Sequence, residues 1–140
     1  MACVTDLVCS LTVPVWSESG VETQVVDAPA WADIDKAIRA LDGHVRSEVY
    51  LHQDRDDAET YMAIAGGSRN RYLVFGCHDN KRYDEAVTPD AADKTVNLVT
   101  GGQTGEFRLR SLVTLNEALE AARVYHQSGQ LAGGVVWRHR

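Results

Sequence analysis

The stretch TYMAIAGGSRNRYLVFGC, residues 60–77, decides the fold. Residues 60–65 and 72–77 are apolar at both odd and even positions, a pattern that predicts two central strands covered on both faces. The glycine-rich segment 66–70 between them predicts a hairpin connection. A phosphate-binding loop would need a helix after these glycines, but the next segment has the pattern of a strand.

Further strands are predicted on both sides of this pair. Val49 and Leu51 alternate with polar or aromatic residues, which is typical of a strand with one face toward a core. Pro14 is expected to end the first strand, with a turn at residues 16–20. The segment 79–93 has the composition of a long loop. These additional strands are expected at residues 4–13, 21–26, 48–52, 94–100, 106–110 and 135–137.

Two helices are predicted from apolar residues at helical spacing. Ile34 and Ile38 mark the first, over residues 30–41. The second begins at a capping box, Thr114-Leu115-Asn116-Glu117, and ends at Gly129. We therefore expect an α+β fold, a mainly antiparallel sheet with two principal helices packed against it, in a single domain spanning residues 1–140.

Charge and composition narrow the classes of function. The net charge is −6, with 14 basic and 20 acidic residues, and no basic run is long enough to follow a phosphate backbone. Nucleic acid is therefore not an expected partner. No segment is apolar enough to span a bilayer, and Asp6 argues against a signal peptide. Three cysteines, Cys3, Cys9 and Cys77, fit reduced thiols, so a cytoplasmic location away from membranes is expected.

No pattern in the sequence predicts catalysis. Cys77 and His78 would point to opposite faces of a strand, which separates a thiol from a neighbouring base. The histidines are scattered, and none forms an i, i+4 pair on one helix. We therefore expect no enzyme activity, no metal and no cofactor.

Partner-binding residues are expected where carboxylates gather in polar segments. The connection at residues 53–59 is acidic, and the segment 79–93 combines acids with an aromatic residue, a mixture that binding surfaces use. The solvated-loop interpretation stays open for both segments. The candidates are Asp54, Asp56, Asp57, Glu59, Asp79, Tyr83, Asp84 and Glu85.

The chain also resembles a known family from residue 31 onward. The resembling features are WADI at residues 31–34 through AIRALDG at 37–43, then YMAIAGG at 61–67 with the strand at 72–77, and finally LNEA at 115–118 through Gly129 and Trp137. In this order they are similar to the bacterial polymorphic-toxin immunity proteins of the first immunity family, which are usually encoded beside toxins with deaminase-type domains. The resemblance covers about three-quarters of the chain.

The resemblance implies an α+β antitoxin that binds its cognate toxin domain and covers the active site or substrate groove. It implies no activity or cofactor, and it assigns no interface residue. The protein would be a monomer or homodimer before toxin binding. Two alternatives stay open: a small-molecule-binding or accessory enzyme domain with a pocket between sheet and helices, and a structural subunit that self-associates through an edge strand at residues 106–110.

Overall fold

The computed structural model describes residues 8–54 and 56–139. These residues form a seven-stranded sheet in the order β2-β1-β3-β4-β5-β6-β9 and a two-stranded sheet, β7-β8, with all pairs antiparallel. The strands are β1 (Ser10–Ser17), β2 (Gly20–Asp27), β3 (Glu48–His52), β4 (Tyr61–Gly66), β5 (Tyr72–His78), β6 (Arg82–Val87), β7 (Thr95–Thr100), β8 (Gln103–Arg108) and β9 (Val136–His139). The helices are α1 (Trp31–Arg39) and α2 (Leu115–Ser128), with 3-10 turns at Ser68–Asn70 and Leu109–Ser111.

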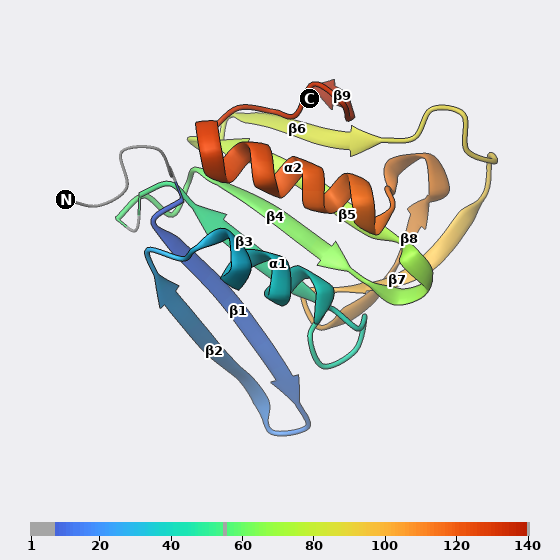
Figure 1. Ribbon diagram of the computed structural model, residues 1–140. Helices are drawn as coiled ribbons and strands as arrows, with labels where there is room; N and C mark the ends of the chain where they lie inside the picture. Colours follow the sequence, from blue (N-terminus) through green and yellow to red (C-terminus); the bar gives the residue numbers. More distant parts are fainter. Residues whose placement is uncertain (1–7, 55, 140) are drawn as a thin grey trace.

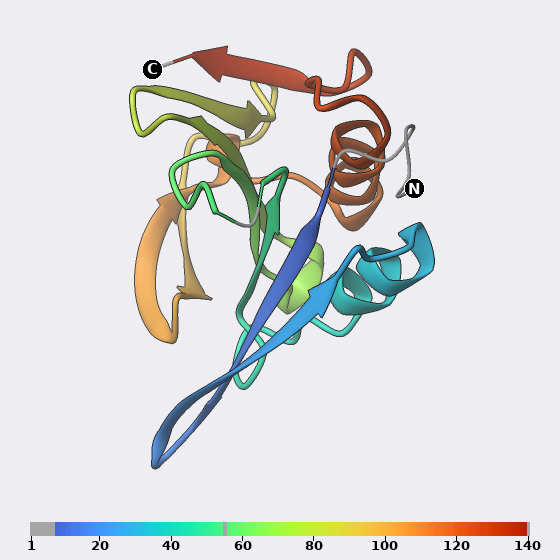
Figure 2. The ribbon, with the colours of Figure 1, turned by 90° about the vertical axis from the view of Figure 1, so that its left-hand side faces the viewer.

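The elements are stacked in layers around the large sheet. Both helices lie on one face of the sheet, as Figure 1 shows, and the β7-β8 hairpin lies on the other, as Figure 2 shows. This arrangement confirms the predicted α+β class with a mainly antiparallel sheet and two helices packed against it. No helix within the described residues is long and apolar enough to cross a membrane.

The main core lies between the sheet and the helices. Ile34 and Ile38 of α1 are fully buried, and they belong to one apolar cluster with Met62 and Ile64 of β4 and Leu51 of β3. Burying a side chain of this size contributes about 1.5–3 kcal/mol. The apolar periodicity of the sequence therefore fixes which face of the sheet the helices cover.

Helix α2 begins and ends as its sequence predicts. The Thr114 hydroxyl accepts a hydrogen bond from the Glu117 amide at 3.4 Å, and the Glu117 carboxylate accepts one from the Thr114 amide at 3.1 Å. Gly129 ends the helix in the left-handed region, at φ 71°. Near this end, the buried His126 ring lies 3.0 Å from the Pro29 carbonyl oxygen through Nε2, which ties α2 to the start of α1.

The β7-β8 hairpin is tied to the opposite face of the sheet by a polar network around Glu48, which is only 3% exposed. The Trp16 indole N–H donates to the Glu48 carboxylate at 3.1 Å, and the Ser47 hydroxyl donates to the same oxygen. The Gly102 amide, in the β7-β8 turn, donates to the Ser47 hydroxyl at 3.1 Å. A Cβ on Gly102 would lie 2.6 Å from the Trp16 ring, so glycine is needed for this close approach.

One prediction about secondary structure is wrong: the segment 79–93 is not a single loop. Residues 82–87 form β6, which pairs with β5 and β9. The charged residues Arg82, Asp84 and Glu85 hid this strand, because they interrupt the apolar alternation that marks one. Their charges are matched within the described residues, because Arg82 and His139 lie beside Asp84 and Arg138 pairs with Glu85.

Other strand limits also differ from the prediction. β1 continues through Pro14 to Ser17, because Pro14 lies beyond Ser10–Thr12, the part of β1 that pairs with β3. β8 starts earlier than predicted, because Gly101 and Gly102 both adopt positive φ and close a tight two-residue turn. The part of the first predicted strand at residues 4–7 lies outside the described residues.

Gly67 joins the β4-β5 connection to the end of α1, and its substitution tests this packing. Its φ is +105°, and an added Cβ would lie 2.5 Å from the Leu41 carbonyl oxygen. We expect Gly67→Ala to lower the free energy of unfolding by at least about 2 kcal/mol, because both backbone strain and a clash oppose it. Urea denaturation measures this difference.

The matched control is Gly133→Ala, because nothing lies within 4 Å of an added Cβ at that position. We expect the control to stay within about 0.5 kcal/mol of the unsubstituted protein. Equal stabilities of the two variants would contradict the proposed close contact.

Candidate functional site

Five of the predicted partner-binding residues gather at one end of the sheet. Asp54, Asp56, Asp57 and Glu59 lie between β3 and β4, and Asp79 lies in the β5-β6 turn. We call these five residues the acidic edge. The two segments are joined, because the Asn80 amide donates to the Glu59 carbonyl at 3.1 Å and the Thr60 hydroxyl donates to the Asp79 carboxylate at 3.3 Å.

Two side-chain-to-backbone hydrogen bonds shape the part of the acidic edge between β3 and β4. The Asp54 carboxylate accepts a hydrogen bond from the Asp56 amide, and the Asp57 carboxylate accepts one from the Glu59 amide, each at 2.9 Å. These turns leave Asp56 and Glu59 exposed to solvent. Two of the predicted carboxylates therefore shape the loop, while Asp56 and Glu59 are available to a partner.

Not every charge at this end of the sheet is negative. Lys81 and Arg82 are exposed in the same turn as Asp79, and the imidazole of His78 lies 3.5 Å from the Asp79 carboxylate. The carboxylates of the β3-β4 connection lie apart from these groups along the chain. By sequence, residues 53–59 hold four carboxylates and one arginine, Arg55, so this connection carries a net charge of −3.

The structure places Asp84 and Glu85 inside strand β6, with only 5% and 8% of their surfaces exposed. The Asp84 carboxylate contacts the His139 imidazole and lies 3.6 Å from the Arg82 guanidinium. Glu85 accepts a hydrogen bond from Arg138 at 2.8 Å on the opposite face of the sheet. These pairs hold β9 against β6. Neither carboxylate is therefore exposed as it would be in a surface loop.

A row of half-buried rings crosses the face of the sheet that the helices leave uncovered. It consists of Tyr50, Tyr61, Phe75 and Tyr83, on the adjacent strands β3, β4, β5 and β6. We call it the aromatic row. The rings of Tyr50 and Tyr61 are 5.8 Å apart, and those of Tyr61 and Phe75 are 6.1 Å apart, both edge to face. Burial raises the pKa of the Tyr50 and Tyr61 hydroxyls, so both rings stay uncharged at neutral pH.

The aromatic row meets the acidic edge. The Tyr83 hydroxyl lies 3.5 Å from the side-chain oxygen of Asn80, and Tyr61 follows Glu59 and Thr60 directly along the chain. Sequence reasoning selected only Tyr83. The sequence does indicate the orientation of Tyr50. This ring alternates with the buried Val49 and Leu51, so it must face away from the helices.

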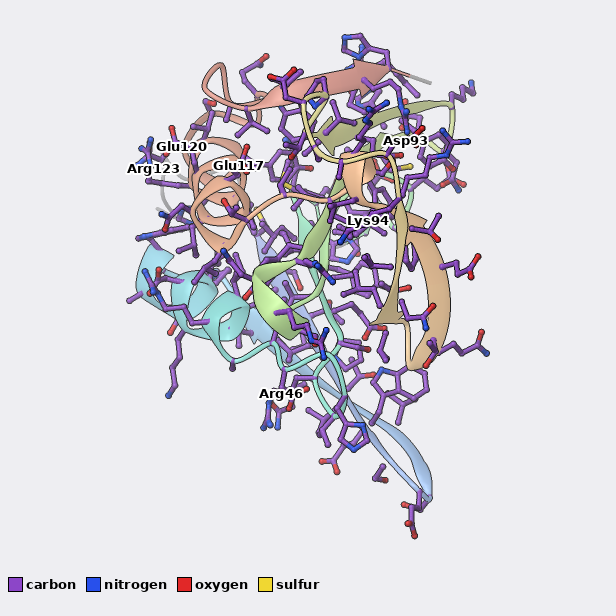
Figure 3. All side chains as sticks on the ribbon, turned by 90° about the vertical axis from the view of Figure 1, so that its right-hand side faces the viewer. Arg46, Asp93, Lys94, Glu117, Glu120 and Arg123 are labelled. Atoms are coloured by element: carbon purple, nitrogen blue, oxygen red, sulfur yellow. The ribbon has the colours of Figure 1, made fainter. Side chains whose placement is uncertain are left out.

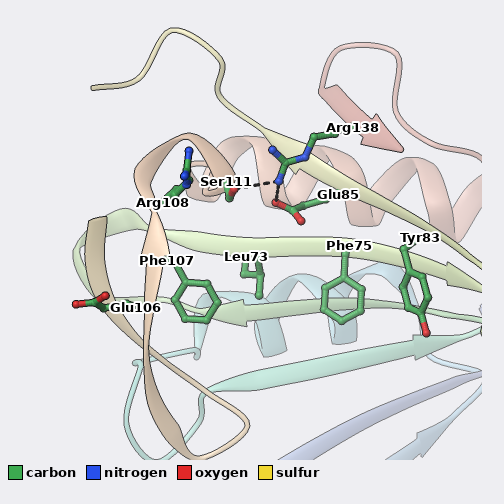
Figure 4. A pocket seen from close by; sticks show the side chains of 9 residues that line it. All are labelled: Leu73, Phe75, Tyr83, Glu85, Glu106, Phe107, Arg108, Ser111 and Arg138. Carbon is green, nitrogen blue, oxygen red and sulfur yellow. Dashed lines mark hydrogen bonds and ion pairs between the residues drawn. The ribbon is translucent and has the colours of Figure 1, made fainter. Parts of the chain in front are cut away.

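A depression of about 700 Å³ lies between this face of the sheet and the β7-β8 hairpin (Figure 4). Phe75 and Tyr83 line its floor, Phe107 of β8 lines its wall, and the Glu85–Arg138 pair lies at one side. Its volume is within the range of ligand pockets. The depression is open to solvent, and its one buried carboxylate, Glu85, is already paired with Arg138.

Cys77 and His78 lie next to each other on β5, and their environments differ as the strand pattern predicts. Cys77 is buried, with its sulfur 3.3 Å from the Glu59 carbonyl oxygen, whereas His78 is exposed. Among residues 8–54 and 56–139, no group of three or more histidine, cysteine or carboxylate side chains is placed to hold a metal ion.

His52 is a titratable residue that lies beside Tyr61 of the aromatic row and directly before the acidic connection at residues 53–59. Its ring centroid lies 5.9 Å from that of Tyr61, and its Nδ1 atom is buried with no hydrogen-bond partner among the described residues. Burial lowers the pKa of this imidazole, and the charge of Asp57 opposes the shift in part. The folded protein therefore favours the neutral ring.

Comparison with protein families gives the class of the molecule. The family model described as immunity protein Imm1 matches residues 22–139, which include both helices and all strands except β1 and the first two residues of β2. The chain therefore belongs to the Imm1 family of immunity proteins, and this membership supports an immunity, or antitoxin, role that involves a toxin protein. A comparison with curated proteins gave no match.

The lowered pKa of His52 predicts a pH-dependent stability. The unfolded chain takes up a proton near the ordinary histidine pKa of about 6.5, while the folded protein resists it, so stability falls as the pH drops below that value. We expect His52→Gln to lose less thermal stability than the unsubstituted protein between neutral pH and a pH one unit below 6.5. Thermal unfolding at both pH values measures the difference.

His78→Gln is the control, because His78 is exposed. His52→Gln should lose less stability on acidification than this control, because His52 has a buried ring nitrogen with no hydrogen-bond partner among the described residues. If His52→Gln and the unsubstituted protein lost equal stability on acidification, the proposed burial of the neutral ring would be wrong.

Proposed function

We propose that this immunity protein binds a cognate toxin domain in the cytoplasm and neutralises it, and that the toxin is a nucleic-acid deaminase. The observation that carries the proposal is the Imm1 family match over residues 22–139. Its physical basis is the exposed acidic edge, in which Asp56 and Glu59 face solvent. Neutralisation by binding requires no catalytic group of the antitoxin.

The proposed mechanism is competition with nucleic acid. An enzyme that acts on nucleic acid needs a basic substrate groove, because its substrate is a polyanion. The carboxylates of the acidic edge present negative charge to such a groove in place of phosphates. Complementary charge of this kind increases the association rate more than it increases the final affinity.

The aromatic row supplies the second half of the proposed interface. Tyrosine and other large side chains near the centre of an interface carry much of its binding free energy. The half-buried rings of Tyr61 and Tyr83 lie beside the acidic edge and lose little conformational freedom on binding, because their neighbours already fix them. The carboxylates would thus guide the toxin to the surface, and the rings would slow its dissociation.

The depression beside the aromatic row keeps a second function open, the binding of a small molecule. The observation in its favour is the size of the depression, about 700 Å³, with aromatic rings and the Glu85–Arg138 pair on its walls. Because the depression is open on one side, it suits an inserted toxin side chain better than a ligand that needs to be enclosed. We therefore assign it to the proposed toxin interface.

Charge reversal at the acidic edge tests the proposed function. We expect Asp56→Lys combined with Glu59→Lys to slow association with the toxin domain by about tenfold or more at low salt, because steering is lost. The loss should shrink as salt is added, since added ions screen exposed charges. Surface plasmon resonance over a series of salt concentrations measures the association rate.

The matched control is Asp90→Lys combined with Asp93→Lys, which changes the net charge equally. Both carboxylates are exposed in the segment between β6 and β7. Figure 3 shows Asp93 on the side of the molecule that faces away from the viewer of Figure 2. Equal association rates for the two double variants would show that the acidic edge is not part of the interface. Normal protection of toxin-producing cells by both variants would show the same.

A further inference from the structure

Strand β2 is an exposed edge of the seven-stranded sheet. All its residues are exposed, including Val21 at 49% and Val25 at 54%. It pairs only with β1 among the described residues, and the β1-β2 hairpin extends past the helices and the β7-β8 hairpin, as Figure 2 shows. An exposed strand edge of this length is a surface on which another strand can add.

The register of the β1-β2 hairpin shows which backbone groups face outward. Its two-residue turn makes Ser17 and Gly20 a hydrogen-bonded pair, and hydrogen-bonded and non-hydrogen-bonded pairs alternate from there. Trp16 lies opposite Val21 and donates its amide to the Val45 carbonyl instead, which agrees with this alternation. The amides and carbonyls of Val21, Thr23 and Val25 therefore point away from β1.

Within the described residues, β2 carries few of the features that usually protect an edge strand against pairing. Edge strands are commonly blocked by charged side chains, lysine above all, or by proline, a bulge or a covering segment. Residues 20–27 contain neither lysine nor proline, and they pair with β1 in continuous register. Their charged residues are Glu22 and Asp27, so any pairing of β2 must keep these carboxylates apart.

We propose that β2 pairs antiparallel with β2 of a second copy of this chain, about a two-fold axis at Thr23. This register places Thr23 opposite Thr23 and Val21 opposite Val25 of the second copy. All three pairs use the outward backbone groups identified above. Val21 and Val25 of both copies then lie on one face of the joined sheet, and Glu22 lies opposite an uncharged residue, Gln24.

Because only alternate residues of β2 have outward backbone groups, the register can shift only in steps that keep these groups paired. The two neighbouring registers that result are less favourable. A shift in one direction places Glu22 opposite Glu22 of the second copy, and like charges directly opposite are destabilising. The shift in the other direction places Val21 opposite Asp27 and separates the valine pairs. The sequence of β2 therefore selects the two-fold register at Thr23, which closes into a dimer and does not extend into a fibre.

This dimer is distinct from the proposed toxin complex. None of the residues of the acidic edge lies in β2. Each copy carries a net charge of −6, so added salt should favour dimer formation by screening the repulsion between copies. Added salt weakens the proposed electrostatic association with a toxin, so the two interactions respond to salt in opposite directions.

Sedimentation velocity over a range of protein concentrations, at low and high salt, tests the proposed dimer. We expect a monomer–dimer equilibrium that shifts toward dimer at high salt. Thr23→Pro removes two hydrogen-bond donors from the dimer, one from each copy, and we expect it to weaken dimer formation by about tenfold or more. Proline is tolerated where an edge amide faces solvent, so the β1-β2 hairpin keeps its own hydrogen bonds.

Val136→Lys is the control, because Val136 is 53% exposed on β9 at the opposite edge of the same sheet. It should form dimers as the unsubstituted protein does. A protein that stays monomeric under all conditions would overturn the proposal, and so would a folded Thr23→Pro variant that forms dimers normally.

Amide hydrogen exchange on the unsubstituted protein gives a second test that needs no variant. We expect exchange at Val21, Thr23 and Val25 to slow as protein concentration rises, while the inward amides of β2 change little. Concentration-independent exchange at these three amides in a sample that contains dimer would place the interface elsewhere and overturn the proposal.

Discussion

Strand β4 is buried on both faces, and the rest of the structure is arranged to cover it. Met62 and Ile64 face the helices, while the small side chains of Ala63 and Ala65 face the other side of the sheet. The helices cover the first face along its length. The second face is covered at one end by the β7-β8 hairpin, which the network around Glu48 holds in place.

The second face of the sheet is covered only in part, and the rest of it is the face that we propose for toxin binding. Beyond the hairpin, the rings of Tyr50, Tyr61 and Phe75 protect the alanine side of β4, and they remain half-exposed themselves. The connections that follow the ends of β3 and β5 bring carboxylates to the border of this surface. The proposed toxin complex uses this surface, with charge for rapid association and rings for slow dissociation.

Much of the fold follows from patterns that are local in the sequence. The capping box at Thr114, the helical spacing of Ile34 and Ile38, and the apolar pair of strands around Gly66 each predict their element, because each depends on nearby residues. β6 could not be predicted in this way. Its Asp84 and Glu85 are buried only because β9, far away in the chain, supplies His139 and Arg138.

The same distinction applies to the candidate site. The carboxylates at residues 53–59 were predicted from composition and lie in an exposed connection, where Asp56 and Glu59 face solvent. The aromatic row was missed as a unit, because its rings come from four strands and meet only when the registers of the sheet are known. Alternation predicts the face of each ring but not its neighbours across strands.

The most direct test is inhibition of a cognate nucleic-acid deaminase domain, measured as base conversion on nucleic acid while the purified protein is titrated in. The proposed function predicts complete loss of activity at a one-to-one ratio, and it predicts that the loss develops more slowly at high salt or with the Asp56→Lys, Glu59→Lys protein. Full deaminase activity in the presence of excess folded protein would contradict it.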